Sequence, residues 1–325
     1  MTAGIAANAI ALVALLALVI WKARRPTDAV RLRNALLLEP SRDEDFTWVP
    51  PDFPQNYAVD RLPASSEFTE IVASLGVDAI PRDWDKALAL AAHLSEHAEG
   101  MGPLRDDLSK TYAGIRRGYG YCADFVKVYL ALARAAGLDA RQWAFSFDGF
   151  GGHGHTVVEV FDRQRGKWLL LDVFNNFHVV DAGSGEPLGA LEYRDALLGR
   201  RTEATMRPNG PGRPGFVHEH KALDYYRRGI DQWYLVWGNA VFSYYGHPAV
   251  KATGKVSRTL AHLTANLVGV QPRIRLFRTS GNAELVQRMF ALRRWLLAML
   301  GLLALLSATL VVQLLLRPGN VGLSA

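Results

Sequence analysis

Uncharged apolar runs occupy both ends of the 325-residue chain, and the middle has the composition of a soluble domain. The first run, from about Ala3 to Trp21, and the second, Trp295 to Leu316, are each long enough for one helical crossing of a bilayer. Asn8 interrupts the first run, and Gln313 is the one clearly polar residue of the second. The pattern predicts a transmembrane helix at 1–21, and a second one with a short tail at 293–325.

A cleaved signal peptide is the alternative interpretation of the first run. Such a peptide normally has basic residues before its apolar core and a small-residue cleavage site after it. Here residues 1–11 contain no Lys or Arg, and the basic residues Lys22, Arg24 and Arg25 follow the run instead. We therefore favour an uncleaved membrane anchor.

Basic residues also flank the second run on the side of the central domain. Arg288, Arg293 and Arg294 precede it, and only Arg317 follows. Because positively charged flanks stay in the cytoplasm, we expect a multi-pass protein of the inner (plasma) membrane with both chain ends outside and a cytoplasmic central domain. The lipid bilayer is thus an expected partner, contacted through two helices.

The net charge and the cysteine content limit the classes of protein to which the chain could belong. Much of the formal charge of +6 lies beside the apolar ends, where membrane orientation explains it better than nucleic-acid binding. The chain has no zinc-finger spacing and no stripe of basic and aromatic residues, so no nucleic-acid partner is expected. The single cysteine, Cys122, excludes an internal disulfide and is compatible with a reducing compartment.

Residues 22–66 are interpreted as a linker or arm, because several prolines and an acidic cluster argue against a long helix there. The central domain is expected at 67–215. Apolar residues at helical spacing predict helices over 68–75, 83–99, 104–115 and 123–136. The last of these is nearly all apolar, which predicts a buried helix, and Gly137 provides its C-cap.

After Gly137 the apolar pattern changes to the period of strands. Strands are expected over 140–147, 155–161 and 167–173, with a flexible glycine loop at 148–152 and a hairpin turn at 162–166. A buried helix followed by antiparallel strands predicts an α+β fold flanked by the two transmembrane helices.

The remainder of the chain gives weaker signals. Residues 181–214 look loop-like, with a helix expected at 190–198. An aromatic-rich extension, 216–292, is expected to be helical over 219–245, where it would cap the domain or pack near the bilayer. A further helix is expected over 249–268.

The candidate chemistry centres on residues 118–125, which read GYGYCADF and place Cys122 in a glycine-rich turn that opens the apolar helix. A thiolate is the nucleophile most easily prepared near neutral pH, and a helix N-terminus stabilises it. The same free N–H groups could stabilise an oxyanion. Gly118 and Gly120 permit the tight turn and leave room for a substrate backbone. A small buried hydrophobe is the alternative interpretation of a lone cysteine.

An imidazole and a carboxylate would complete the chemistry. The imidazole would take the thiol proton and return it to a leaving amine. The carboxylate would hold the imidazole in the right tautomer. If Arg163 and Gln164 form the tip of the hairpin, residues whose numbers sum to 327 face each other, which places His155 opposite Asp172. A bulge at Gly166 would shift this register by one residue.

Four motifs in order resemble the transglutaminase-like superfamily of papain-like cysteine enzymes. These are the turn and helix at 120–132, GLDAR at 137–141, HTVVEV at 155–160 and WLLLD at 168–172. The resemblance covers about residues 80–180. It implies a papain-like core with Cys122 as nucleophile, His155 as base and Asp172 as the orienting acid.

Two positions depart from the family pattern. Val157 stands where the family often has Trp, and Val173 where proline often follows the aspartate. These departures bear on substrate specificity more than on the triad. No acidic loop has calcium-binding spacing, so calcium activation, metal and cofactor are not expected. Tyr112 and Tyr119 are the candidates for a second oxyanion donor.

Other residues compete for functional roles. His153, in the glycine loop, is the alternative to His155 as base. His178, His218 and His220, with Glu219 nearby, could be metal ligands, but no second cluster has usable spacing, so surface or local hydrogen bonding is the favoured interpretation. The carboxylates of Asp124, Glu159 and Asp162 are interpreted as exposed or capping charges.

The sequence therefore predicts a membrane-anchored cysteine enzyme, a hydrolase or acyltransferase acting on an amide or acyl bond of a protein, peptide or amine substrate through a thioester. Arylamine acetyltransferases use the same kind of catalytic triad, so small-molecule acyl transfer is an enzymatic alternative. A catalytically weak fold that serves as a membrane-tethered binding or scaffold module is the alternative of a different class.

Overall fold

The computed structural model describes residues 3–96, 102, 104, 107–256 and 258–316, and the chain divides into two compact units. Unit 1 combines both ends of the chain with one internal hexapeptide: Met1–Leu38, Asp148–His153 and Thr279–Ala325. Unit 2 holds the remainder, Glu39–Phe147 and Gly154–Arg278.

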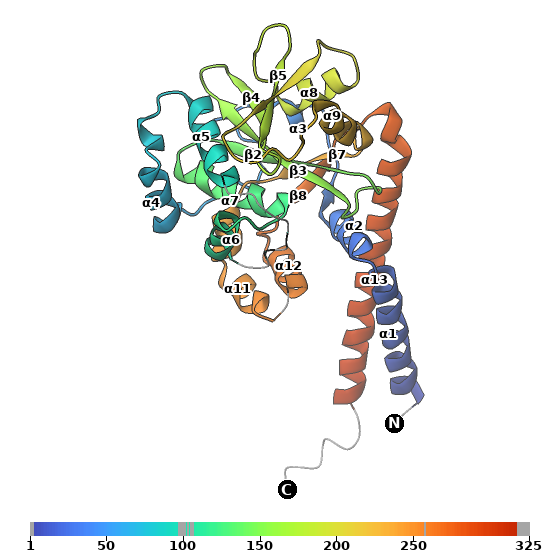
Figure 1. Cartoon of the computed structure of the whole chain (residues 1–325). Helices are drawn as coiled ribbons and strands as arrows, with labels where there is room; N and C mark the ends of the chain where they lie inside the picture. The colour runs from blue at the N-terminus through green and yellow to red at the C-terminus, as the bar shows by residue number, and fades with distance from the viewer. Residues whose placement is uncertain (1–2, 97–101, 103, 105–106, 257, 317–325) are drawn as a thin grey trace. The chain divides into compact units, whose positions relative to one another are not determined.

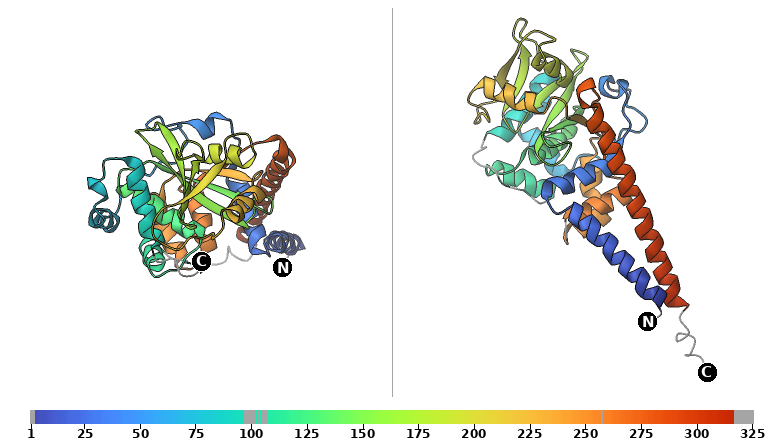
Figure 2. Two further views of the ribbon diagram at one scale, coloured as in Figure 1. Left: turned by 45° about the horizontal axis from the view of Figure 1, so that its top comes forward. Right: turned by 90° about the vertical axis from the view of Figure 1, so that its right-hand side faces the viewer.

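The helices of unit 1 include the two apolar runs. They are α1 (Ala3–Lys22), α2 (Pro26–Leu37) and α13 (Ala283–Leu315), the last preceded by the 3₁₀ turn η2 (Ser280–Asn282). Helix α1 lies along α13 (Figure 1), and Figure 2 shows α13 as one uninterrupted helix. Helix α1 and the helical stretch Ser280–Leu315 are long and apolar enough to cross a membrane.

The polar residues of the two apolar runs contact each other. Asn8 Nδ2 donates to the Leu306 carbonyl across 3.2 Å and to Gln313 Oε1 across 3.4 Å. Hydrogen bonds between side chains are a usual means of holding helices together in lipid. The two interruptions of hydropathy are thus one interhelical contact.

Part of the segment 22–66, expected to be a linker, is helical. Helix α2 has Pro26 at its first position, where the missing N–H costs no helical hydrogen bond. The two-residue strand β1 (Leu38–Glu39) and the single turn α3 (Glu44–Thr47) follow it. The prolines from Pro40 onward lie outside α2, in agreement with their effect on helices.

An open eight-stranded sheet in the order β1-β8-β7-β2-β3-β4-β5-β6 gives a mixed α/β fold. The neighbouring strands from β8 to β6 pair antiparallel. Their bounds are β2 (Ala140–Ser146), β3 (Gly154–Asp162), β4 (Lys167–Asp172), β5 (Phe177–Asp181), β6 (Ala204–Pro208), β7 (Trp233–Trp237) and β8 (Arg273–Leu276).

Helices cover both faces of this sheet. On one face Val158 and Val160 join a core with α4 (Ser66–Ser74), α5 (Asp83–Ser95), α6 (Leu108–Arg116) and α7 (Cys122–Ala135). On the other face Val157 and Leu170 pack with α8 (Ala190–Leu197) and α9 (Glu219–Arg228). Alternate strand residues therefore enter two different cores, which makes β3 apolar on both sides.

The expected helices and strands of residues 66–173 are present, with ends shifted by a few residues. The expected end of the helix at 83–99 lies outside the described residues. Gly137 follows α7 with φ of 67°, as a C-cap glycine does. The helix expected at 190–198 corresponds to α8.

The interpretation of the later segments was wrong in several places. The aromatic run at 219–245 is not one helix but α9, the strand β7 and α10 (Val241–Gly246). The expected helix over 249–268 is two helices, α11 (Pro248–Gly254) and α12 (Arg258–Leu267). Strands β5, β6 and β8 were not expected. A short apolar run that is almost entirely buried has no alternation to separate a strand from a helix, which explains the error at β7.

The β3–β4 hairpin has a register two residues away from the expected one. Asp162 pairs with Lys167, so paired residues sum to 329 and not to 327, and the loop has four residues. Gly166 takes a left-handed conformation with φ of 64°, and its N–H donates to the Asp162 carbonyl across 2.8 Å. Because the shift is even, every side chain keeps the face that the expected register gave it.

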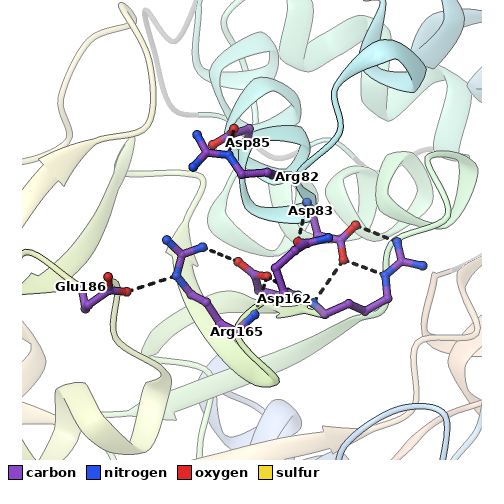
Figure 3. Close-up of polar contacts among 8 residues, drawn as sticks. Arg82, Asp83, Asp85, Asp162, Arg165 and Glu186 are labelled. Atoms are coloured by element: carbon purple, nitrogen blue, oxygen red, sulfur yellow. Dashed lines mark hydrogen bonds and ion pairs between the residues drawn. The ribbon is translucent and has the colours of Figure 1, made fainter.

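Polar contacts hold this loop in place (Figure 3). Asp162 Oδ1 accepts from the N–H groups of Gln164 and Arg165 across 2.9 and 3.1 Å. Arg165 bridges Asp162 and Glu186. Arg163 donates Nε and Nη2 to the two carboxylate oxygens of Asp83, at the start of α5, across 2.6 and 2.7 Å. The hairpin tip is thereby fixed to α5.

Candidate active site

Cys122 is the first residue of α7, and its side chain is partly exposed. Tyr121 is the N-cap residue, and its N–H donates to Asp124 Oδ2 across 3.0 Å. Gly120 has φ of 126°, and a Cβ there would lie 3.2 Å from the Phe125 ring. The glycine turn and the Asp124 cap therefore place the thiol at the free N–H groups of a helix N-terminus.

His155 is the second residue of β3, opposite Phe145 on β2, and is buried. Its ring makes T-shaped contacts with the rings of Phe145, Tyr225 and Tyr226, with centroid distances of 5.7, 5.8 and 6.0 Å. These aromatic contacts restrict the orientation of the imidazole and exclude water from most of its surface.

Asp172, the last residue of β4, is fully buried. His155 Nε2 lies 2.7 Å from its Oδ2. Tyr226 OH and Asn175 Nδ2 donate to the same oxygen, each across 2.6 Å, and the Asn175 N–H donates to Oδ1 across 3.0 Å. Burial alone would raise the pKa of this carboxyl, but the His155 charge and these hydrogen bonds lower it below its usual value.

The imidazole is also coupled to the thiol. Burial would lower the pKa of His155, but the neighbouring charges of Asp172 and Cys122, and hydrogen bonds to both side chains, raise it to about 10. Since Nε2 is directed at Asp172, Nδ1 is the ring nitrogen left for Cys122. The structure thus hydrogen-bonds His155 to Asp172 and places Cys122 near enough to His155 to raise the pKa of the imidazole.

Three residues of this site were not predicted. Asn175 follows Asp172 by three residues, a spacing that an Asx turn could have suggested. Tyr225 and Tyr226 lie in the aromatic run that was interpreted as core or bilayer contact. Burial, followed by the charges at Cys122 and Asp172, raises the pKa of the Tyr225 phenol. Both phenols therefore remain protonated near neutral pH and can donate hydrogen bonds.

The competing histidines have the following surroundings. His153 belongs to unit 1. His178 is buried, and its Nδ1 lies 3.1 Å from Asn209 Oδ1. The His218 and His220 rings stack on each other with centroids 5.6 Å apart. Among the described residues no group of three His, Cys, Asp or Glu side chains could hold a metal ion.

The two tyrosines named as oxyanion donors have other environments. The Tyr112 hydroxyl lies 2.9 Å from His93 Nε2. The Tyr119 side chain is about half exposed.

The three carboxylates interpreted as exposed or capping are buried. Asp124 caps α7, and Asp162 caps the hairpin turn. Glu159 accepts from Arg141 Nε across 2.7 Å and from the N–H of Ala190, the first residue of α8, across 2.6 Å. Capping, one of the two expectations, is confirmed for Asp124 and Asp162, whereas exposure was wrong for all three, because each carboxylate has enough donors to offset the loss of water.

Comparison with known families agrees with this geometry. Residues 75–173 match the family model described as the transglutaminase-like superfamily. This segment is therefore a transglutaminase-like domain, and it contains Cys122, His155 and Asp172. No curated protein and no solved structure matches the chain.

Proposed function

We propose that this protein is a membrane-anchored cysteine enzyme that cleaves or transfers an amide or acyl group through a thioester on Cys122. The observation that carries the proposal is the row formed by the thiol, the imidazole and the carboxylate, with 2.7 Å between His155 Nε2 and Asp172 Oδ2. The match to a superfamily of cysteine-dependent enzymes supports it.

The reaction follows from the roles of these groups. The Cys122 thiol passes its proton to His155, and the sulfur adds to the substrate carbonyl carbon. The bond to the leaving amine breaks as His155 returns the proton to that amine, which leaves a thioester. Water or a second amine then attacks the thioester, giving an acid or a new amide and restoring the thiol. Asp172 keeps the imidazole oriented throughout.

The negative charge that develops on the carbonyl oxygen needs donors. The free N–H groups at the start of α7 provide one set. Tyr225 is our candidate for a second donor in place of Tyr112 and Tyr119. Its ring lies 5.8 Å from that of His155, and no described residue hydrogen-bonds its hydroxyl.

We further propose that the substrate is a protein, peptide or amine reached from the membrane surface. The two apolar helices would hold the enzyme in the inner (plasma) membrane, with the catalytic unit in the cytoplasm because the basic flanks of both helices face it.

Alkylation of the single cysteine tests the enzymatic proposal. Iodoacetamide should label Cys122 much faster near neutral pH than it labels a free cysteine, because a neighbouring imidazole activates a cysteine nucleophile. His155→Ala should remove this enhancement, and mass spectrometry after incubation with acyl donors should find an adduct on the thiol. Slow labelling that is the same in both proteins would instead favour a binding or scaffold module.

A further inference from the structure

The chain segment that leads into His155 is held by the helix next to the first membrane span. Residues 148–153 belong to unit 1 together with α1, α2 and α13, and only Gly154 separates them from His155. Helix α2 begins at Pro26, shortly after α1 ends at Lys22. The loop that we expected to be flexible is therefore bound to the membrane-proximal part of the chain.

Side chains of α2 bind the backbone of this loop at successive residues. Arg31 Nε donates to the Gly149 carbonyl across 3.2 Å, and its Nη2 donates to the Asp148 carbonyl. Asn34 Nδ2 donates to the Phe150 carbonyl across 2.8 Å. Asn34 is almost completely buried, so this hydrogen bond has no competition from water.

The loop has a conformation that it would not adopt without such contacts. Phe150 has φ of 61°, in the left-handed region that non-glycine residues rarely occupy. Its side chain is fully buried. A strained backbone of this kind persists only where the surrounding structure fixes it, and strained residues gather near functional sites.

Close packing continues along the chain to the histidine. A Cβ on Gly152 would lie 3.0 Å from the Val30 side chain, and the Gly152 N–H donates to the Thr27 carbonyl across 3.3 Å. A Cβ on Gly154 would lie 2.0 Å from the Phe145 carbonyl oxygen on β2. Gly152 is thus packed closely against α2, and Gly154 is packed closely against β2.

We propose that Arg31 and Asn34 are positioning residues for His155. They hold the backbone of residues 148–150, and the four residues that follow join this backbone directly to His155, so that their hold on the loop acts on the imidazole through the chain. The inference rests on the proposed function. It means that a membrane-proximal helix, and not only the catalytic unit, determines the reactivity of the thiol.

The test uses the full chain in detergent or lipid nanodiscs and follows the rate of Cys122 alkylation by iodoacetamide between pH 5 and 9. Arg31→Gln and Asn34→Ala should lower the neutral-pH rate about tenfold to a hundredfold, as small misplacements of catalytic groups do. The rate should then rise with pH as it does for a free cysteine. Arg25→Gln is the matched control, because it removes a positive charge three residues after α1, and among the described residues the hydrogen bonds from α2 to residues 148–150 come from Arg31 and Asn34.

Arg31→Lys separates a loss of positioning from a loss of the fold. It keeps the positive charge but cannot bind two carbonyls as the guanidinium does. It should give an intermediate rate with an unchanged circular dichroism spectrum. If the wild-type chain labels fast and Arg31→Gln, Asn34→Ala and Arg31→Lys all label like Arg25→Gln, the positioning inference is overturned while the proposed function stands. Slow labelling of the wild type overturns both.

Discussion

The hydroxyl of Tyr226 donates a hydrogen bond to Asp172 Oδ2 across 2.6 Å, although 54 residues separate the two in the chain. The same carboxylate oxygen faces His155. The orientation of the Asp172 carboxylate therefore depends on α9, which lies outside the segment matched by the family model.

Tyr226→Phe tests this dependence. The change leaves a buried carboxylate without one charge-assisted hydrogen bond, a loss of about 1.5–3 kcal/mol. We expect both the alkylation rate of Cys122 and the free energy of unfolding to fall. Tyr193→Phe is the control, because the Tyr193 ring packs 5.2 Å from that of Tyr226 while its buried hydroxyl has no hydrogen-bond partner among the described residues. Equal behaviour of the two variants would contradict the assignment.

The pKa shifts of the pair predict a pH dependence of stability. The pKa of His155 is raised from 6.5 to about 10, so its contribution is complete below pH 6.5 and is lost as the pH rises to about 10. The pKa of Asp172 is lowered from 3.8, so its contribution is present above pH 3.8 and is lost as the pH falls through the lowered value.

Urea unfolding of the detergent-solubilised chain, followed by tryptophan fluorescence at several pH values, measures this effect. Between pH 6.5 and 10 the wild-type free energy of unfolding should fall more steeply than that of His155→Gln, which has no titrating imidazole at this position. Parallel curves for the two proteins would show that the imidazole is not paired in the folded state.

Much of the triad could be predicted from local sequence because its parts lie on neighbouring elements. The turn before Cys122 and the alternation of β3 are short-range signals. The register was wrong by two residues because nothing in the sequence distinguished a two-residue loop from a four-residue loop closed by Gly166. The prediction that His155 and Asp172 share a face still held, since an even shift preserves it.

The residues that surround the triad could not be predicted in the same way. Tyr226 reaches Asp172 from a helix that follows two further strands, and no spacing rule connects them. The grouping of 148–153 with the chain ends likewise depends on tertiary contacts of Arg31 and Asn34. Sequence patterns indicate which face of an element is buried, but not which distant element covers it.

The contact between Asp83 and Arg163 predicts that removing the arginine side chain lowers the stability of the chain without lowering the reactivity of Cys122. The Asp83 side chain is 3% exposed and the Arg163 side chain 57%, so removing the arginine leaves a buried carboxylate without its main partner. The Arg163 hydrogen bonds lower the pKa of Asp83, so the contribution is present above pH 3.8 and lost as the pH falls below it.

Arg163→Ala should therefore destabilise the chain by about 1–3 kcal/mol at pH 7, and by less near pH 3. Asp83→Asn, and the double variant, complete a mutant cycle that isolates the pair. Thermal unfolding measures the loss, and Cys122 alkylation should stay within about twofold of wild type. A large fall in alkylation would mean that the hairpin tip controls the site.

Membrane orientation gives a prediction that is independent of catalysis. The basic residues beside both apolar helices predict a cytoplasmic catalytic unit and a C-terminus outside. A reporter that is active only in the cytoplasm should be silent when it is fused after Ala325. The same reporter inserted in the loop after Gly199, between α8 and β6, should be active. The reverse pattern would contradict the proposed orientation.

The final prediction separates the Tyr225 hydroxyl from the rest of the site. Alkylation of a thiolate by iodoacetamide forms no oxyanion, whereas acylation by an activated ester does. If Tyr225 donates to that oxyanion, Tyr225→Phe should lower the acylation rate of Cys122 about tenfold to a hundredfold, at or below the usual effect of losing one such donor. It should leave the alkylation rate unchanged, because the phenyl ring keeps the aromatic contact with His155. Tyr226→Phe should lower both rates, since it acts through Asp172 and the imidazole. A Tyr225→Phe variant in which both rates fall together, or in which neither changes, would remove Tyr225 from the reaction and leave the N–H groups of α7 as the proposed oxyanion donors.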